Sequence, residues 1–159
     1  MTALREPDPL TAENFRIASC QATIFTPDEE VSAVKLLAGP VQQWLRRFDA
    51  DPTILPLAEG MPREIPRLIL NSTSESWRCE IASARMNVFW RRTKTVSPSL
   101  TPGLTEFFTE ATTLLSEYSD FVKARVGRMA AVLTRFAPHP EPGLFLSRHF
   151  CNERWFHAR

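Results

Sequence analysis

The chain has 159 residues, of which 43% are hydrophobic and 23% charged, the size and composition of one soluble globular domain. Its formal net charge is only +1, and no stretch approaches the roughly 18 consecutive apolar residues that a membrane span requires. These features exclude a membrane-spanning protein at the level of sequence, and we expect no membrane partner.

The expected compartment follows from the N-terminus and the cysteines. The first residues lack the basic patch and apolar run of a secretory signal. Cys20, Cys79 and Cys151 are an odd number without paired spacing, which favours reduced thiols. We therefore expect a cytoplasmic protein whose cysteines are small buried hydrophobes and not reactive groups.

The first predicted elements are a frayed end, a strand and a helix start. Residues 1–13 are rich in proline and acid, and we expect them to be frayed. In residues 15–25 apolar and polar side chains alternate, which predicts a half-buried strand. Thr26, followed by Pro27 and Glu29, supplies the capping pattern of a helix start.

The helix predicted after Thr26 is interrupted by Gly39-Pro40, because proline lacks the N–H that continues the hydrogen-bond ladder. One kinked helix or two short helices fit equally well. Residues 49–66 contain four prolines and predict a surface loop that is functional or mobile. We expect one side of the helical segment to be apolar, formed by Val31, Val34, Val41, Trp44, Leu45 and Phe48.

Three short strands are predicted next, joined by connections short enough for hairpins at residues 72–75 and 83–84. These strands should therefore pair antiparallel. Their inward residues are predicted to be Leu68 and Leu70 in the first, Trp77, Cys79 and Ile81 in the second, and Met86, Val88 and Trp90 in the third.

The clearest helix spans Leu104–Val122, where apolar residues recur at i, i+3, i+4 and i+7. Gly127 is a candidate for the residue that stops it. Gly127–Phe136 is predicted to be a strand, although a helix fits nearly as well. Pro138–Gly143 is predicted to be a turn. Leu144–His157 is predicted to be a last strand or a strand plus a short helix.

The order of these elements predicts the fold class. The order is strand, helix, a meander of three strands, helix, strand, strand, which favours an α+β fold with helices on one face of an antiparallel sheet. We predict an antiparallel sheet of about five strands with two main helices packed on one face. Residues 14–159 should form this single α+β domain.

A histidine and cysteine cluster near the C-terminus could bind zinc: His139, His149, Cys151 and His157. His-x-Cys in a strand would put two ligands on one face. The spacing matches no common zinc finger, however, and the neighbouring aromatic residues favour a packed edge. We predict no metal and no cofactor, and keep a zinc-dependent or cysteine enzyme using this cluster as an alternative.

Basic and aromatic residues interleave in two stretches, and residues 121–159 carry seven basic against two acidic side chains. Aromatic faces flanked by arginines can stack bases while the cations meet phosphates. Core aromatics that alternate with solvated arginines would give the same pattern. A nucleic-acid-associated protein is a further alternative, which would use Arg91, Arg92, Lys94, Arg148 and Arg154.

The aromatic content favours protein–protein interaction, since four tryptophans and eleven phenylalanines are many for this length. The leading prediction is a non-enzymatic, bacterial or phage-borne module that binds another protein, or a second copy of itself as a homo-oligomer. It would act as an adaptor, a chaperone-like protein or an inhibitor of the antitoxin type. The candidate partner-binding residues are Trp77, Trp90, Arg91, Arg92 and Trp155.

The chain resembles a sporadically distributed, little-characterised family of bacterial proteins. The features that carry the resemblance are a turn, an arginine and a tryptophan within the strand triplet, followed by the long helix and a strand. Members of that family are longer and have a second α+β half, so the resemblance implies the N-terminal half of such a protein and no catalytic residues. A likeness to small α+β export or antitoxin chaperones rests on architecture alone. The resemblance covers residues 15–136 and is carried by Ser72–Glu75, Arg85, Trp90, Leu104–Val122 and Val126–Phe136.

Overall fold

The computed structural model describes residues 14–26, 32–56, 61–93, 103–123 and 125–150, with the backbone alone for 148–150. Residues 1–13, predicted to be frayed, lie outside the described residues. The chain separates into two compact units. The larger is Ala18–Thr134, and the smaller joins Met1–Ile17 to Arg135–Arg159.

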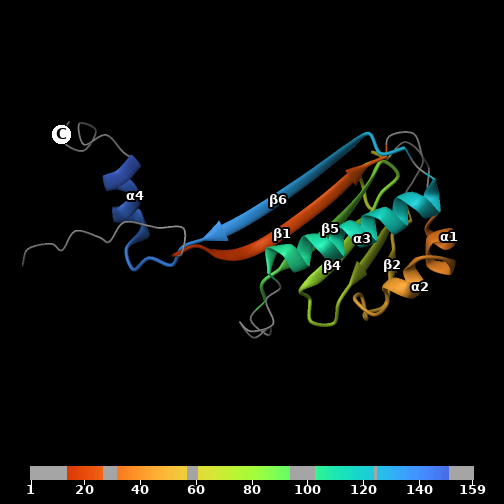
Figure 1. The fold of residues 1–159 in the computed structure, drawn as a ribbon, viewed down its shortest axis with the longest axis horizontal. Helices are drawn as coiled ribbons and strands as arrows, with labels where there is room; N and C mark the ends of the chain where they lie inside the picture. The colour runs from red at the N-terminus through yellow and green to blue at the C-terminus, as the bar shows by residue number, and fades with distance from the viewer. Residues whose placement is uncertain (1–13, 27–31, 57–60, 94–102, 124, 151–159) are drawn as a thin grey trace, which may run out of the picture. The chain divides into compact units, whose positions relative to one another are not determined.

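A single six-stranded antiparallel sheet, in the order β2-β3-β4-β5-β1-β6, forms the centre of the fold (Figure 1). The predicted α+β class is confirmed, whereas the predicted count of about five strands is not. The additional strand is a two-residue pairing inside the proline-rich loop. The strands are β1 Arg16–Phe25, β2 Thr53–Ile54, β3 Leu68–Asn71, β4 Trp77–Ile81, β5 Arg85–Arg91 and β6 Arg128–Phe136.

The predicted strand triplet is confirmed as the antiparallel pairs β3–β4 and β4–β5. Trp77 lies opposite Trp90, and Cys79 opposite Val88, so the large apolar residues of neighbouring strands share one face. β1 joins the other side of β5, with Cys20 opposite Trp90. All of these side chains are at most 6% exposed, which makes this face the core of the sheet.

The helix α3, Leu104–Val122, packs on this core face (Figure 1). Its buried residues follow the predicted helical spacing and are Phe107, Ala111, Leu114, Leu115 and Tyr118. The helix ends at Val122 because Lys123 adopts a left-handed conformation with φ 53°. Gly127, the residue predicted to stop it, lies further along, just before β6.

Two short helices, α1 Ala33–Ala38 and α2 Val41–Trp44, stand where one kinked helix or two short ones were predicted. The break falls at Gly39-Pro40, as proline requires. The predicted start at Thr26 is not seen: α1 has Ser32 as its N-cap, and residues 27–31 lie outside the described residues. Of the predicted apolar side, Val34 is 70% exposed and Leu45 36%, so these two side chains do not belong to the core. The described residues contain four helices, of which one is long, so the two main helices expected are not confirmed.

Polar side-chain contacts join α2 and the segment after it to α3. Trp44 Nε1 donates to Glu117 Oε2 at 2.7 Å. Arg47 forms an ion pair with Glu110 at 3.0 Å and lies 4.7 Å from the centroid of the Trp77 ring. These contacts tie α2 and the residues that follow it to both halves of α3.

The smaller unit contains α4, Pro142–Phe150, where a last strand, or a strand plus a short helix, was predicted. The helix is favoured because the Phe145 N–H donates to Glu141 O at 3.0 Å, closing a helical turn. His139 prepares this start, since its Nδ1 accepts from the Glu141 N–H at 3.1 Å. Its ring also lies 4.8 Å from that of Phe145, which is 6% exposed. Among the described helices, none combines the length and hydropathy needed to cross a membrane.

Candidate protein-interaction surface

The structure places the two described tryptophans of the predicted partner site inside the core. Trp90 is 1% exposed and Trp77 is 6% exposed. The Trp77 ring is stacked on Phe107 with centroids 5.5 Å apart and is covered by Arg47. Both side chains therefore support the sheet from within and offer no surface to a partner. Trp155 lies outside the described residues.

Arg91 is exposed, but it contacts its own chain. Its Nε donates to Glu75 O at 3.0 Å, and its Nη2 lies 3.2 Å from Glu75 Oε2. Glu75 occupies the left-handed region with φ 55°, at the tip of the hairpin between β3 and β4. Arg91 thus holds a strained turn in place, although an ion pair this exposed contributes little by itself.

The remaining cations of the nucleic-acid alternative are not brought together within the described residues. Arg92 is half-buried, and its backbone N–H donates to Ala18 O at 2.8 Å. Lys94 and Arg154 lie outside the described part of the chain, and Arg148 is placed by backbone only, in α4. Of the five predicted cations, the structure therefore describes the side chains of Arg91 and Arg92 alone.

The predicted zinc cluster is likewise only partly described. His139 uses Nδ1 to accept a backbone N–H, and His149 lies in α4, so the strand geometry assumed for His-x-Cys does not apply. Cys151 and His157 lie outside the described residues. Within the described ranges, no group of three or more His, Cys, Asp or Glu side chains is arranged to hold a metal ion.

Two cysteines are described, and both are buried with free thiols. Burial raises the pKa of the Cys20 thiol. Burial, with a smaller contribution from the Glu80 carboxylate, raises the pKa of Cys79 far above its usual range. Both shifts favour the neutral thiol over the thiolate, which is the nucleophilic form.

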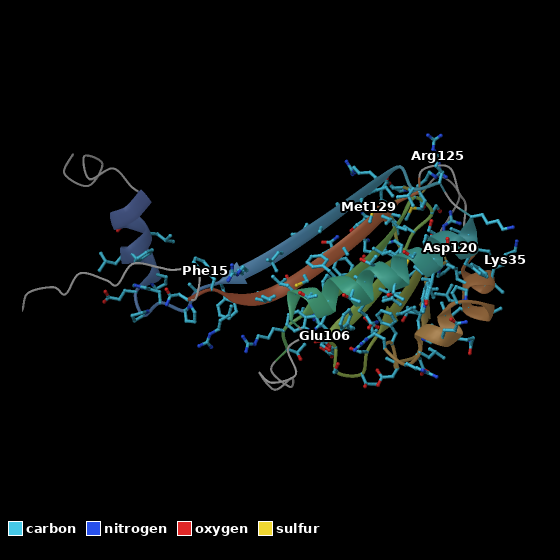
Figure 2. The ribbon with its side chains drawn as sticks, viewed as in Figure 1. Phe15, Lys35, Glu106, Asp120, Arg125 and Met129 are labelled. Atoms are coloured by element: carbon cyan, nitrogen blue, oxygen red, sulfur yellow. The ribbon has the colours of Figure 1, made fainter. Side chains whose placement is uncertain are left out.

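Among the described residues, the longest fully exposed strand is β6, which lies at one edge of the sheet (Figure 1). All nine of its residues are exposed. Met129, visible on β6 in Figure 2, is 66% exposed, and Val132 and Leu133 are 53% and 39% exposed. Within the described residues β6 pairs only with β1, so its outer edge presents unpaired backbone N–H and C=O groups.

Both faces of β6 are apolar. Val132 and Thr134 line a concave surface together with Gln21 and Phe89, so these even-numbered residues face away from α3. Because side chains alternate along a strand, Met129 and Leu133 share the opposite face, which is the α3 side of the sheet. A strand of this kind needs cover on two faces and one edge.

The arginines at the two ends of β6 do not shield this edge. Arg128 lies over the Phe25 ring, with Cζ 4.1 Å from the centroid. Within the smaller unit, Arg135 Nη2 donates to Phe15 O at 3.1 Å, and Cζ lies 5.6 Å from the Phe15 ring. Charged side chains commonly protect sheet edges from association, but here both cations are turned onto β1 and its extension.

The opposite edge of the sheet is closed to strand addition. The strand β2 has only two residues, Thr53–Ile54, and prolines stand at positions 52 and 56. Short strands and prolines are common ways to prevent edge-to-edge pairing. The two edges of this sheet are therefore unequal, and β6 is the one that can accept a strand.

A concave surface that encloses about 730 Å³ lies beside β6, on the face of the sheet opposite α3. Its lining includes side chains from β3, β4, β5, β1 and β6, namely Asn71, Arg78, Phe89, Gln21, Val132 and Thr134. Gln21 also bonds to polar side chains beside this surface: its Nε2 donates to Thr23 Oγ1 at 3.1 Å. Thr23 Oγ1 in turn donates to Asn87 Oδ1 at 2.9 Å. The surface thus combines polar side chains with the aromatic residues Phe89 and Trp90.

Sequence reasoning identified β6 as a strand but not as the exposed surface. The signal lay in residues 129–133, Met-Ala-Ala-Val-Leu, which are apolar without alternation. A half-buried antiparallel strand alternates, and a continuous apolar run indicates a strand covered on both faces. The comparisons with known proteins supply no assignment, since no family model, curated protein or solved structure matches the chain.

Proposed function

We propose that this protein is a non-enzymatic interaction module that binds a protein partner at the outer edge of β6. The observation that carries the proposal is a nine-residue edge strand with every residue exposed and apolar side chains on both faces. An added strand would satisfy the unpaired backbone groups and bury Met129 and Leu133 at once. Backbone pairing and apolar burial would together provide affinity, and they would explain why β6 is exposed in the isolated chain.

The concave surface gives such a partner a means of being recognised. A strand added beside β6 would run past Val132 and Thr134, which belong to the lining of that surface. Alternate side chains of the partner could therefore reach toward Gln21 and Phe89, while the intervening ones lie on the α3 side. Backbone pairing would provide affinity, and these side chains would provide selectivity.

Capture from extracts of the source organism tests the proposal with three baits: the wild-type chain, Met129→Lys and Val34→Lys. Val34 is a matched control, because it is an apolar residue of similar exposure, 70% against 66%, on α1. A charge on the edge should abolish capture, whereas Val34→Lys should retain it. Equal capture by all three folded baits would contradict binding at β6.

A further inference from the structure

We propose that the strand paired to β6 is β6 of a second copy of this chain, in an antiparallel two-fold dimer with its axis at Ala131. The proposal rests on the binding role assigned to the β6 edge and names its occupant. The two sheets would join into one continuous antiparallel sheet, with both α3 helices on the same side. The residues involved are 128–134, all within the larger unit.

Symmetry restricts which residues can meet. In a two-fold antiparallel pair the axis is perpendicular to the sheet, so each face of one copy continues into the same face of the other. Even-numbered residues of β6 must then pair with even-numbered ones, and odd with odd. Arg128 of one copy can therefore never lie opposite Arg135 of the other.

The side chains favour an axis at Ala131. Met129 then lies opposite Leu133 of the second copy, which joins the two large exposed apolar side chains of the α3 face twice. Ala131 meets its own copy, so the centre is not crowded. With the axis moved to Val132, Met129 would instead lie opposite the charged Arg135. The axis at Ala131 is therefore the better match of size and charge.

Charge also favours a second copy as the occupant. Residues 129–133 carry no charge, so they are best matched by an uncharged apolar strand, which the same segment provides. Arg128 would lie opposite Thr134 at each end of the ladder, far from its own copy. The chain has a net charge of only +1, so two copies meet little long-range repulsion.

The size of the contact sets the expected strength. Seven paired residues form a contact smaller than the roughly 800 Å² per partner of a standard interface. We therefore expect a reversible dimer with a dissociation constant in the range of about 1 to 100 µM. Sedimentation velocity of the purified full chain should show the sedimentation coefficient rising across that range, and Met129→Lys should weaken dimerisation about tenfold or more. Val34→Lys should dimerise as the wild type does.

Cysteine cross-linking tests the register, in a Cys151→Ser background. Across the axis the two Cα atoms of residue 131 would be about 4.5 to 5.5 Å apart, within the range that a disulfide spans. Mild oxidation should therefore cross-link Ala131→Cys efficiently. The matched control is Ala130→Cys, whose two copies would be diagonal neighbours about 7 to 8 Å apart and should not cross-link.

The outcomes separate this inference from the proposed function. A chain that stays monomeric throughout the concentration range overturns the dimer. Cross-linking of Val132→Cys in place of Ala131→Cys overturns the register. If the chain is monomeric and Met129→Lys still loses a captured protein, the β6 edge binds a different partner, and only the identity of the occupant is wrong. If the wild-type chain and Met129→Lys dimerise equally well, the contact between copies lies elsewhere and the dimer through β6 is overturned, while the capture experiment alone decides the proposed function.

Discussion

At the scale of single residues, Trp77 illustrates why an aromatic residue that suits an interface can belong to the core. Its ring is held between Arg47 on one side and Phe107 on the other. Sequence periodicity placed it correctly on the inward face of its strand, but the same aromatic character suggested a partner site. Only the position of α3 and of the segment after α2 decides between these roles, and both depend on contacts distant in sequence.

Asp49 offers a test of the local hydrogen bonding that fixes the β3–β4 turn. Its carboxylate accepts the Thr73 N–H at 2.7 Å and the Thr73 hydroxyl at 2.7 Å. These two bonds, the backbone one first, lower the pKa of Asp49 below its usual value. Because the folded pKa is depressed, the stabilisation is complete above the unfolded pKa and is lost as the pH falls through the folded pKa.

An NMR titration of the side-chain carboxyl carbons should therefore give Asp49 a pKa below the usual aspartate range in the wild-type chain. Thr73→Ala should return only part of the shift, since the backbone N–H remains. Thr73→Ser keeps the hydroxyl and should titrate as the wild type does. A wild-type Asp49 that titrates at the ordinary value would show that these bonds do not persist in solution.

At the scale of elements, the sequence predicted what local pattern determines. The alternation in β4 and β5 and the helical spacing in α3 each arise from a face that must be buried, and each was found at the expected residues. The strand β2, which the sequence missed, and the helix α4, which it allowed only beside a strand, depend on other parts of the chain. Thr53–Ile54 forms a strand by pairing with β3. The start of α4 includes a hydrogen bond from the Glu141 N–H to His139 Nδ1.

The β6 strand shows the same limit for the candidate site. Its local pattern identified a strand, with a helix as a near alternative. Its place at the end of the sheet, which leaves it exposed, follows from the order of the strands and not from its own residues. The two arginines that could have protected the edge turn onto phenylalanines 103 and 120 positions away in sequence, which no local pattern indicates.

Docking of α2 on α3 can be tested at Glu117. Trp44 is 3% exposed, and its indole N–H donates to the Glu117 carboxylate. Glu117→Ala leaves a buried donor without its partner and should lower the free energy of unfolding by about 1 to 3 kcal/mol. Glu117→Gln keeps an oxygen acceptor and should cost less. Urea denaturation gives the values, with the exposed Asp120→Ala on the same helix as the control (Figure 2). Equal stability of Glu117→Ala and wild type would contradict this account of the docking.

At the scale of the whole molecule, the buried apolar side chains of the described residues gather in the larger unit. Apart from Phe145, every one of them belongs to residues 18–134. The sheet, α3 and the two short helices therefore contain one continuous core, and the edge proposed to bind a partner lies on the same unit. Stability and binding should both be properties of this unit.

A chain that ends after Phe136 tests this division. It keeps all of β6 but loses residues 137–159, including α4. Since the core of the larger unit is complete without them, thermal unfolding should remain cooperative, with a midpoint within about 5 °C of the full chain. Because the proposed dimer uses only residues 128–134, sedimentation should also show the same concentration dependence. An unfolded product would show that the C-terminal segment stabilises the sheet, and a folded monomer would place the contact between copies in the removed residues.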